Sequence, residues 1–210
     1  MSNKILSQSY TLEEMSKSNR LYSPSEGYRD NAYIHTQDGR FYANNPTWSL
    51  NAIAHALAQT ARYRGNCDEF YSVAEHSVLV SFLMEHVVGG DPYEGILHDA
   101  TESILPDVSS PFKQLFPDLR AVDKQFEATL RDHFGLGPEK SQECVKADWL
   151  ALFIESAQIL PNRGVDFEDP YNFRPEALKL REQKGWKIRC LNWKTAKSVY
   201  LQRFEEVKPK

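Results

Sequence analysis

Two short segments of the chain carry side chains that commonly bind metal ions. The first is Ala74–Ser77, which contains His76, and the second is Leu97–Glu102, which contains the adjacent pair His98 and Asp99. This pair follows an apolar run, where burial of a carboxylate is unfavourable unless a cation compensates for it. The residue types and their spacing therefore predict a metal-dependent hydrolase.

A fourth potential ligand, Asp148, lies further along the chain, where a carboxylate interrupts an apolar helical pattern. A His, His, Asp, Asp set from three helices suits a divalent ion that keeps open coordination sites. A closed structural zinc site would favour cysteine ligands instead. We expect one divalent ion, with Mn, Co, Fe, Zn or Mg as candidates, and an open position for a water molecule whose pKa the ion lowers.

Length and composition favour one soluble domain over residues 1–210. Hydrophobic residues make up 41% of the chain and charged residues 26%, as is typical of globular proteins. The net charge of −4 argues against a nucleic-acid partner, and without an apolar run of about 18 residues we expect no membrane span. The start of the chain lacks the apolar core of a signal peptide. Cys67, Cys144 and Cys190 are widely separated, as expected of free thiols in the cytoplasm.

Hydrophobic spacing and capping residues predict an all-α bundle behind a short N-terminal β-hairpin. The dipeptide Asp38-Gly39, between short aromatic runs, predicts the hairpin within about 31–45. Helices are predicted at about 49–63, 73–88, 92–105, 119–134, 138–160 and 193–207.

These helices must position the potential ligands. His76 is expected early in the second helix, the pair His98-Asp99 midway along the third, and Asp148 in the fifth. The helical core is expected over about 46–160, with a separate C-terminal helix. Residues 161–190 are rich in proline and aspartate and show no strong period, so no helix is predicted there.

The order His76, His98-Asp99, Asp148 resembles that of the HD-domain phosphohydrolases. Segments Ala61–Gly65 and Phe70–Ser77, together with His98–Glu102, look like the branch that includes bacterial 5′-deoxynucleotidases and phage dATP triphosphohydrolases. The resemblance covers about residues 30–160. It implies an HD-domain helical bundle with one catalytic metal ion, and commonly a homo-oligomer.

The resemblance also implies roles for two acidic residues. Glu102 would be the general acid/base, and in a continuous helix it would lie one turn after His98 on the same rim. Asp107 would accept a hydrogen bond from the 3′-hydroxyl of the sugar. The alternatives are a solvated surface residue for Glu102 and an ordinary turn residue for Asp107.

Four further residues correspond to substrate contacts in that branch. Arg62 would bind phosphate through its planar guanidinium, Lys113 would meet the phosphate chain, and Pro111 would wall the base pocket. Tyr63 stands where relatives often have tryptophan and could stack on a sugar or base. Solvated surface positions are the alternatives for Arg62 and Lys113.

Together these features predict a metal-dependent deoxynucleotide phosphohydrolase, with a dATP-like deoxynucleoside triphosphate as substrate. Two cations near the metal favour a polyphosphate, but a 5′-deoxynucleoside monophosphatase remains an alternative. Alarmone hydrolysis ranks lower because that group usually has Glu-Asp where this chain has Glu102-Ser103. A non-catalytic nucleotide sensor is a further alternative, although a sensor would not need Glu102.

Overall fold

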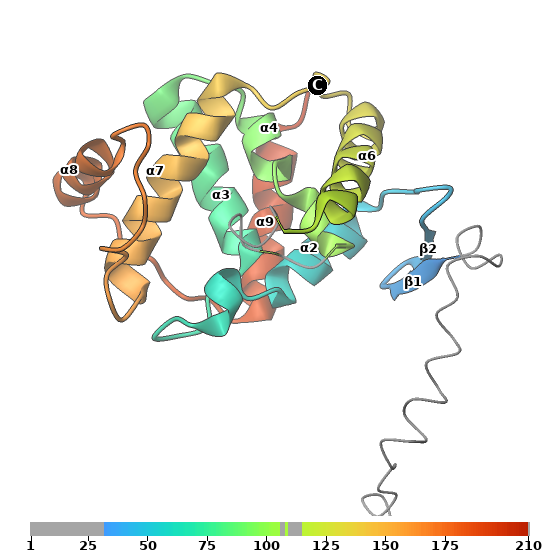
Figure 1. The fold of residues 1–210 in the computed structure, drawn as a ribbon, viewed down its shortest axis with the longest axis horizontal. Helices are drawn as coiled ribbons and strands as arrows, with labels where there is room; N and C mark the ends of the chain where they lie inside the picture. The colour runs from blue at the N-terminus through green and yellow to red at the C-terminus, as the bar shows by residue number, and fades with distance from the viewer. Residues whose placement is uncertain (1–31, 106–107, 109–114, 210) are drawn as a thin grey trace, which may run out of the picture.

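The structure, a computed structural model, describes residues 32–105, 108 and 115–209. Within these residues it is mostly helical, with one two-stranded antiparallel sheet (Figure 1). The elements are β1 Tyr33–Thr36, β2 Gly39–Tyr42, α2 Leu50–Gln59, α3 Val73–Leu83, α4 Pro92–Leu97, α6 Pro117–His133, α7 Gln142–Ile159, α8 Arg174–Lys184 and α9 Trp193–Val207. Three short turns of other helix types are η2 Arg62–Gly65, η3 Met84–Val88 and η4 Ala100–Ser103. The predicted helical fold behind a hairpin is confirmed at this level.

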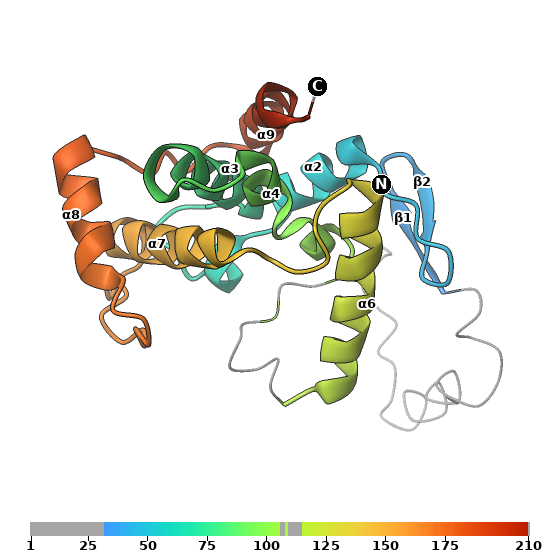
Figure 2. The same ribbon diagram turned by 90° about the horizontal axis from the view of Figure 1, so that it is seen from above.

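Helix α3 lies at the centre of the molecule and contacts α2, α4, α7 and α9. Figures 1 and 2 show α3 and α4 on one side of α7, with α8 against the outer side of α7 and the hairpin at the opposite end. Because α3 has neighbours on several sides, its buried residues cover about half of its circumference, a wider face than the apolar stripe of an ordinary surface helix. A histidine on such a helix is held inside the protein.

Two apolar clusters meet along α3. One cluster joins the hairpin, α2, α4, α6 and α9 to Val73 and Ala74 at the start of α3. The other joins α7 and α8 to Val80 and Leu83 further along α3. His76 lies in the chain between these two sets, so polar groups near it sit at the seam between the clusters.

The hairpin pairs Tyr33 with Tyr42 and Thr36 with Gly39, so its turn residues are Gln37 and Asp38. The turn was expected one residue later, at Asp38-Gly39. Gly39 instead opens β2 with a φ of 121°, a conformation that favours glycine. The Asp38 carboxylate accepts hydrogen bonds from Ser49 and Asn51 at the start of α2, which ties the hairpin to the bundle.

The structure corrects the third predicted helix. Helix α4 ends at Leu97, and His98 and Asp99 therefore lie in the turn between α4 and η4 rather than midway along a helix. The carbonyl of Gly95, which in a continuous helix would accept from the amide of residue 99, accepts from the His98 ring at 2.8 Å. The His98 ring thus makes the hydrogen bond that a backbone amide would make in a continuous helix.

Other boundaries also differ from the prediction. Helix α2 ends at Gln59, before an extended Thr60, and α7 begins after Ser141, whose hydroxyl accepts from the amide of Cys144. Helix α8 lies within 161–190, where no helix was predicted. The predicted helices at 119–134 and 193–207 correspond to α6 and α9.

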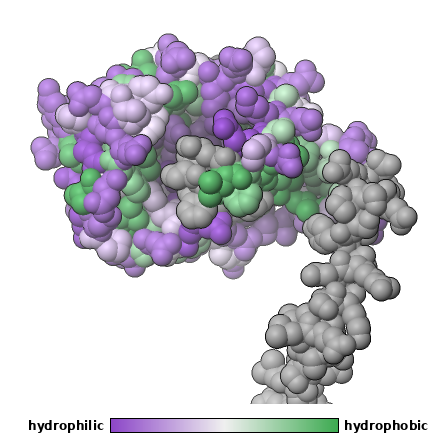
Figure 3. Space-filling view, in the orientation of Figure 1, coloured by the Kyte–Doolittle hydropathy of each residue, from purple (hydrophilic) through white to green (hydrophobic). Residues whose placement is uncertain are grey.

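Hydrophilic residues cover most of the face shown in Figure 3, with smaller apolar patches between them. None of the helices that the structure describes is both long and apolar enough to cross a membrane.

A buried ion pair fixes α4 against α6. An Arg131 guanidinium nitrogen lies 2.8 Å from a carboxylate oxygen of Glu94, and the two residues are only 3% and 6% exposed. The amide and hydroxyl of Ser141 also donate to Glu94. Burial raises the pKa of Glu94, but these donors and Arg131 outweigh it and hold the pKa below its ordinary value.

We expect Glu94→Ala to lower the free energy of unfolding by about 3–5 kcal/mol, because it leaves a buried guanidinium without its counter-charge. Urea unfolding at neutral pH measures the change. The matched control is Glu127→Ala, which removes a carboxylate 4.0 Å from the same arginine but with a side chain 35% exposed, and should cost less than about 1 kcal/mol. Equal losses from both substitutions would contradict the importance of the buried pair.

Candidate metal centre

Four side chains from three parts of the chain converge at the seam between the apolar clusters. The Nε2 atoms of His76 and His98 are 3.2 Å apart. Asp99 Oδ2 lies 3.1 Å from His98 Nε2 and 3.5 Å from His76 Nε2, and Asp148 Oδ1 lies 3.1 Å and 3.9 Å from the Nε2 atoms of His76 and His98. Ligand atoms that each sit about 2.1 Å from one ion lie about 3.0–3.5 Å from one another. The spacing of His76, His98 and Asp99 thus fits a single divalent ion, since their ligand atoms all lie within 4.8 Å of one another. Asp148 lies beside the two histidines but outside this group of three.

The proton positions on the two rings also fit a cation. Nδ1 of His98 faces the carbonyl oxygen of Gly95, and Nδ1 of His76 faces a carboxylate oxygen of Glu155 at 2.7 Å. Both partners are acceptors, so both rings carry their proton on Nδ1, and in the neutral form Nε2 is left with a lone pair. Two nitrogen lone pairs and an oxygen of Asp99 then lie close together, with Asp148 beside them, and a cation would stabilise this arrangement.

The surroundings set the charges of these groups. Burial and the Arg62 charge lower the pKa of His76, but Glu155 and a hydrogen bond with Asp148 raise it overall to about 9. Burial raises the pKa of Asp99, but His98, Lys140 and His76 hold it well below its ordinary value. Partial desolvation raises the pKa of Asp148, and hydrogen bonding and charge from His76 bring it down to about 2. The carboxylates are therefore ionised, and a proton on His76 would compete with an ion.

The centre opens to solvent on one side. The side chains of both histidines are fully buried, that of Asp99 is 15% exposed, and that of Asp148 is 43% exposed. Lys140, on the loop before α7, places its Nζ 3.6 Å from Asp99 Oδ1, with its side chain one-third exposed. A ligand would approach from the side of Asp148 and Lys140.

Comparison with known proteins places the chain in a family. No protein-family model matches it. It is 34% identical over 128 residues to the uncharacterized protein YfdR of Escherichia coli, covering 59% of this chain and 70% of YfdR. The chain belongs to the YfdR family. A further relative is the uncharacterized protein RCAP_rcc00048 of Rhodobacter capsulatus, which is 33% identical over 149 residues, covering 63% of this chain and 76% of that protein.

In this YfdR-family chain, Arg62 and Tyr63 are occupied by contacts within the protein. Arg62 lies 3.2 Å from a Glu155 oxygen and 3.8 Å from Asp99 Oδ2, and its side chain is 14% exposed. The Tyr63 hydroxyl donates to the same Glu155 oxygen at 3.0 Å, and its ring stacks on Phe167. Their predicted contacts with substrate stay predictions, and both side chains are already engaged with Glu155.

The backbone beside Arg62 is strained. Tyr63 and Arg64 have φ values of 53° and 56°, a left-handed conformation that costs non-glycine residues about 1–3 kcal/mol each. Backbone hydrogen bonds from Arg62 to Tyr71 and from Val73 to Thr60 close this loop. The loop brings Arg62, Tyr63 and Tyr71 to the same carboxylate, Glu155.

Glu102 lies in η4, where its amide donates to the carbonyl of Asp99 at 3.0 Å. Because α4 ends before His98, the expectation that Glu102 follows one turn later in a continuous helix is wrong. Its predicted acid/base role stays a prediction. Asp107, Pro111 and Lys113 lie outside the described residues.

Two residues at the centre were missed by the sequence analysis. Glu155 follows Asp148 by two helical turns in α7 and interrupts an apolar run, a signal that could have placed it on the same face. Lys140 lies in a loop and reaches Asp99 only through tertiary structure, so no sequence pattern pointed to it.

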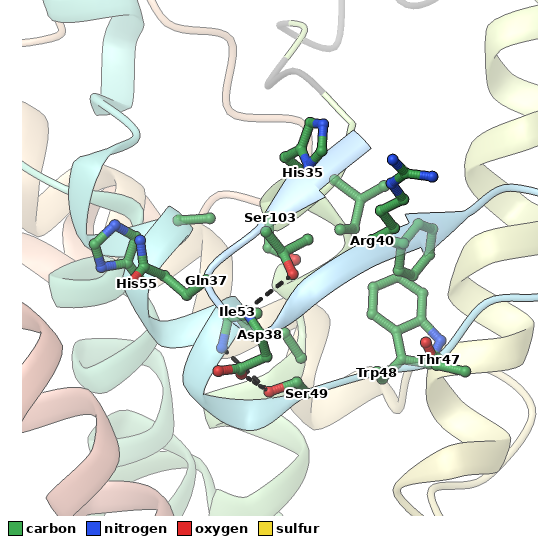
Figure 4. Close-up of a pocket in the computed structure, with 15 residues that line it drawn as sticks. His35, Gln37, Asp38, Arg40, Thr47, Trp48, Ser49, Ile53, His55 and Ser103 are labelled. Atoms are coloured by element: carbon green, nitrogen blue, oxygen red, sulfur yellow. Dashed lines mark hydrogen bonds between the residues drawn. The ribbon is translucent and has the colours of Figure 1, made fainter. Parts of the chain in front are cut away.

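A separate pocket of about 470 Å³ lies between the hairpin, α2 and η4 (Figure 4). His35, Arg40, Trp48 and Ser103 are among its lining residues, and none of the four potential metal ligands is. It is therefore distinct from the candidate metal centre.

We expect Mn²⁺ affinity to rise with pH up to about 9, by up to about tenfold per unit, because the ion must displace the proton that His76 otherwise holds. Isothermal titration of the metal-free protein between pH 6 and 9 measures this. Asp148→Ala is the control and should bind the ion weakly at every pH. A pH-independent affinity would contradict the proposed competition at His76.

Proposed function

We propose that the chain is an HD-domain phosphohydrolase that uses one divalent ion to hydrolyse deoxynucleoside triphosphates, with dATP-like molecules as substrates. The observation that carries the proposal is the cluster of His76, His98 and Asp99, whose potential ligand atoms all lie within 4.8 Å of one another, with the half-exposed Asp148 3.1 Å from His76. The order of these residues in the chain supports it through the resemblance to that group of enzymes.

The charges beside the centre favour an anionic substrate. When bound, a divalent ion supplies Lewis-acid chemistry to a phosphate group. Lys140 adds a cation on the open side, where its ammonium lies next to Asp99. Arg62 is nearly buried and paired with Glu155, so we assign the first phosphate contact to Lys140 and a supporting role to Arg62.

Hydrolysis of the substrate adds one water molecule across a phosphoester bond. The water oxygen bonds to phosphorus, the bond from phosphorus to the 5′ oxygen breaks, and the leaving oxygen gains a proton. We assign the transfer of that proton to Glu102. Through the resemblance, the same proposal includes contacts of Asp107 with the sugar, Pro111 with the base and Lys113 with the phosphates. It also includes a homo-oligomeric state.

A substrate panel tests the proposed function. With Mn²⁺ or Co²⁺, the protein should convert dATP to deoxyadenosine and triphosphate, with a kcat/KM about 10–100-fold above that for ATP, because a buried 2′-hydroxyl without a partner costs about 1–3 kcal/mol. Asp148→Ala should be inactive. Equal rates for dATP and ATP would contradict the deoxynucleotide preference, a preference for dAMP would make the protein a monophosphatase, and metal binding without turnover of any nucleotide would indicate a sensor.

Glu102→Gln should keep the metal ion and lower kcat by about 10²–10⁴-fold, as expected for loss of proton transfer. Glu143→Gln, at an exposed position in the first turn of α7, is the matched control and should leave kcat unchanged. A Glu102→Gln protein with the parent kcat would assign the proton transfer to another group.

Lys140→Gln should lower kcat/KM for dATP by about 10–100-fold, because it removes a charge-assisted contact worth about 1.5–3 kcal/mol. Lys146→Gln removes the same charge at a side chain of similar exposure that pairs with Glu176 instead, and should leave kcat/KM unchanged. Similar losses from both substitutions would indicate a general effect of net charge and contradict a direct contact.

A further inference from the structure

The carboxylate of Glu155 is completely buried, at 0% exposure, and accepts from four donors. One oxygen, Oε1, lies 2.7 Å from His76 Nδ1 and 2.9 Å from the Tyr71 hydroxyl. The other, Oε2, lies 3.0 Å from the Tyr63 hydroxyl and 3.2 Å from an Arg62 nitrogen. All four partner atoms can donate, and an ionised carboxylate accepts at both oxygens, so the geometry is that of a buried anion.

We infer that Glu155 is a positioning residue for the metal centre and acts through His76. It holds the His76 ring with the Nδ1 proton toward α7 and the Nε2 lone pair toward His98. The inference rests on the proposed metal centre, but it does not depend on which substrate is hydrolysed.

The same carboxylate also positions a cation beside a second potential ligand, Asp99. Its other oxygen holds Arg62, which lies 3.8 Å from Asp99 Oδ2. The buried Glu155 carboxylate therefore holds one potential ligand, His76, directly, and holds the Arg62 guanidinium beside another, Asp99. Stability alone does not require a charge at this place, because apolar replacements of buried ion pairs are often neutral or stabilising.

Replacing the carboxylate by an amide would disturb this arrangement without changing its size. In Glu155→Gln, one of the two terminal atoms becomes an NH₂ group that faces donors. If that group faces His76, Nδ1 must accept, and the ring proton moves to Nε2, the atom that would bind the ion. If it faces Arg62 and Tyr63, it meets the donors of both side chains. In either orientation the guanidinium keeps only the Asp99 carboxylate, at 3.8 Å, as a counter-charge.

Metal titration without nucleotide tests the inference. We expect Glu155→Gln to weaken Co²⁺ affinity about 10–100-fold, as is typical when the partner of a ligating histidine is removed, and to change the visible absorption spectrum of the bound Co²⁺. Glu155→Asp keeps the charge but shortens the side chain, and should give a smaller loss. Tyr71→Phe removes a different donor from the same oxygen and should change the affinity less than about threefold.

Thermal unfolding of the metal-free proteins separates positioning from a purely structural role. A folded Glu155→Gln protein with the parent Co²⁺ affinity and spectrum, and only a lower unfolding temperature, would overturn the inference. Should that variant fail to fold, parent affinity in Glu155→Asp would overturn it equally. Tight Co²⁺ binding that depends on Glu155, in a protein that hydrolyses no nucleotide, would support the inference while contradicting the proposed function.

Discussion

Charge compensation among two buried histidines and two carboxylates is the constraint on which this structure depends. The Nε2 atoms of both histidines and the oxygens of Asp99 and Asp148 lie within 3.1–3.9 Å of their neighbours across the centre. Such an arrangement is stable only where positive charge is supplied. Protein groups supply part of it: Arg62 and Lys140 flank Asp99 from two directions. The proton that His76 holds supplies the rest in the metal-free protein, and a bound cation would take its place.

The fold meets this constraint by placing polar groups at the seam between two apolar clusters. Helix α3 contributes residues to both clusters, so His76 is held from several sides. Local irregularities serve the same end. Helix α4 ends before His98, and the His98 ring donates a hydrogen bond to the carbonyl oxygen of Gly95. The left-handed backbone at Tyr63 and Arg64 turns the loop back toward Glu155. Each irregularity costs conformational energy that the surrounding packing must offset.

Residue type and order were enough to predict that His76, His98, Asp99 and Asp148 lie near one another, because an aspartate beside an apolar pattern is rarely buried without a partner. The hairpin and helices α6 and α9 could also be predicted, since turn residues and apolar stripes specify them locally. The end of α4 could not, because it depends on a hydrogen bond from a side chain to the backbone. Helix α8 has few buried residues of its own and depends on packing against α7, which no local pattern reveals. Glu155 and Lys140 join the centre through tertiary contacts.

The buried Arg131 also has a mechanical role. Besides Glu94, it donates to the carbonyl oxygens of Gly137 and Glu139, the latter immediately before Lys140. The loop that carries Lys140 is thereby fastened to the end of α6, a helix that projects from the body of the molecule (Figure 2). Lys140 is therefore held on both sides, with Glu139 bound to Arg131 of α6 and Ser141 bound to Glu94 of α4, and the ammonium group extends from a backbone that is restrained at two points.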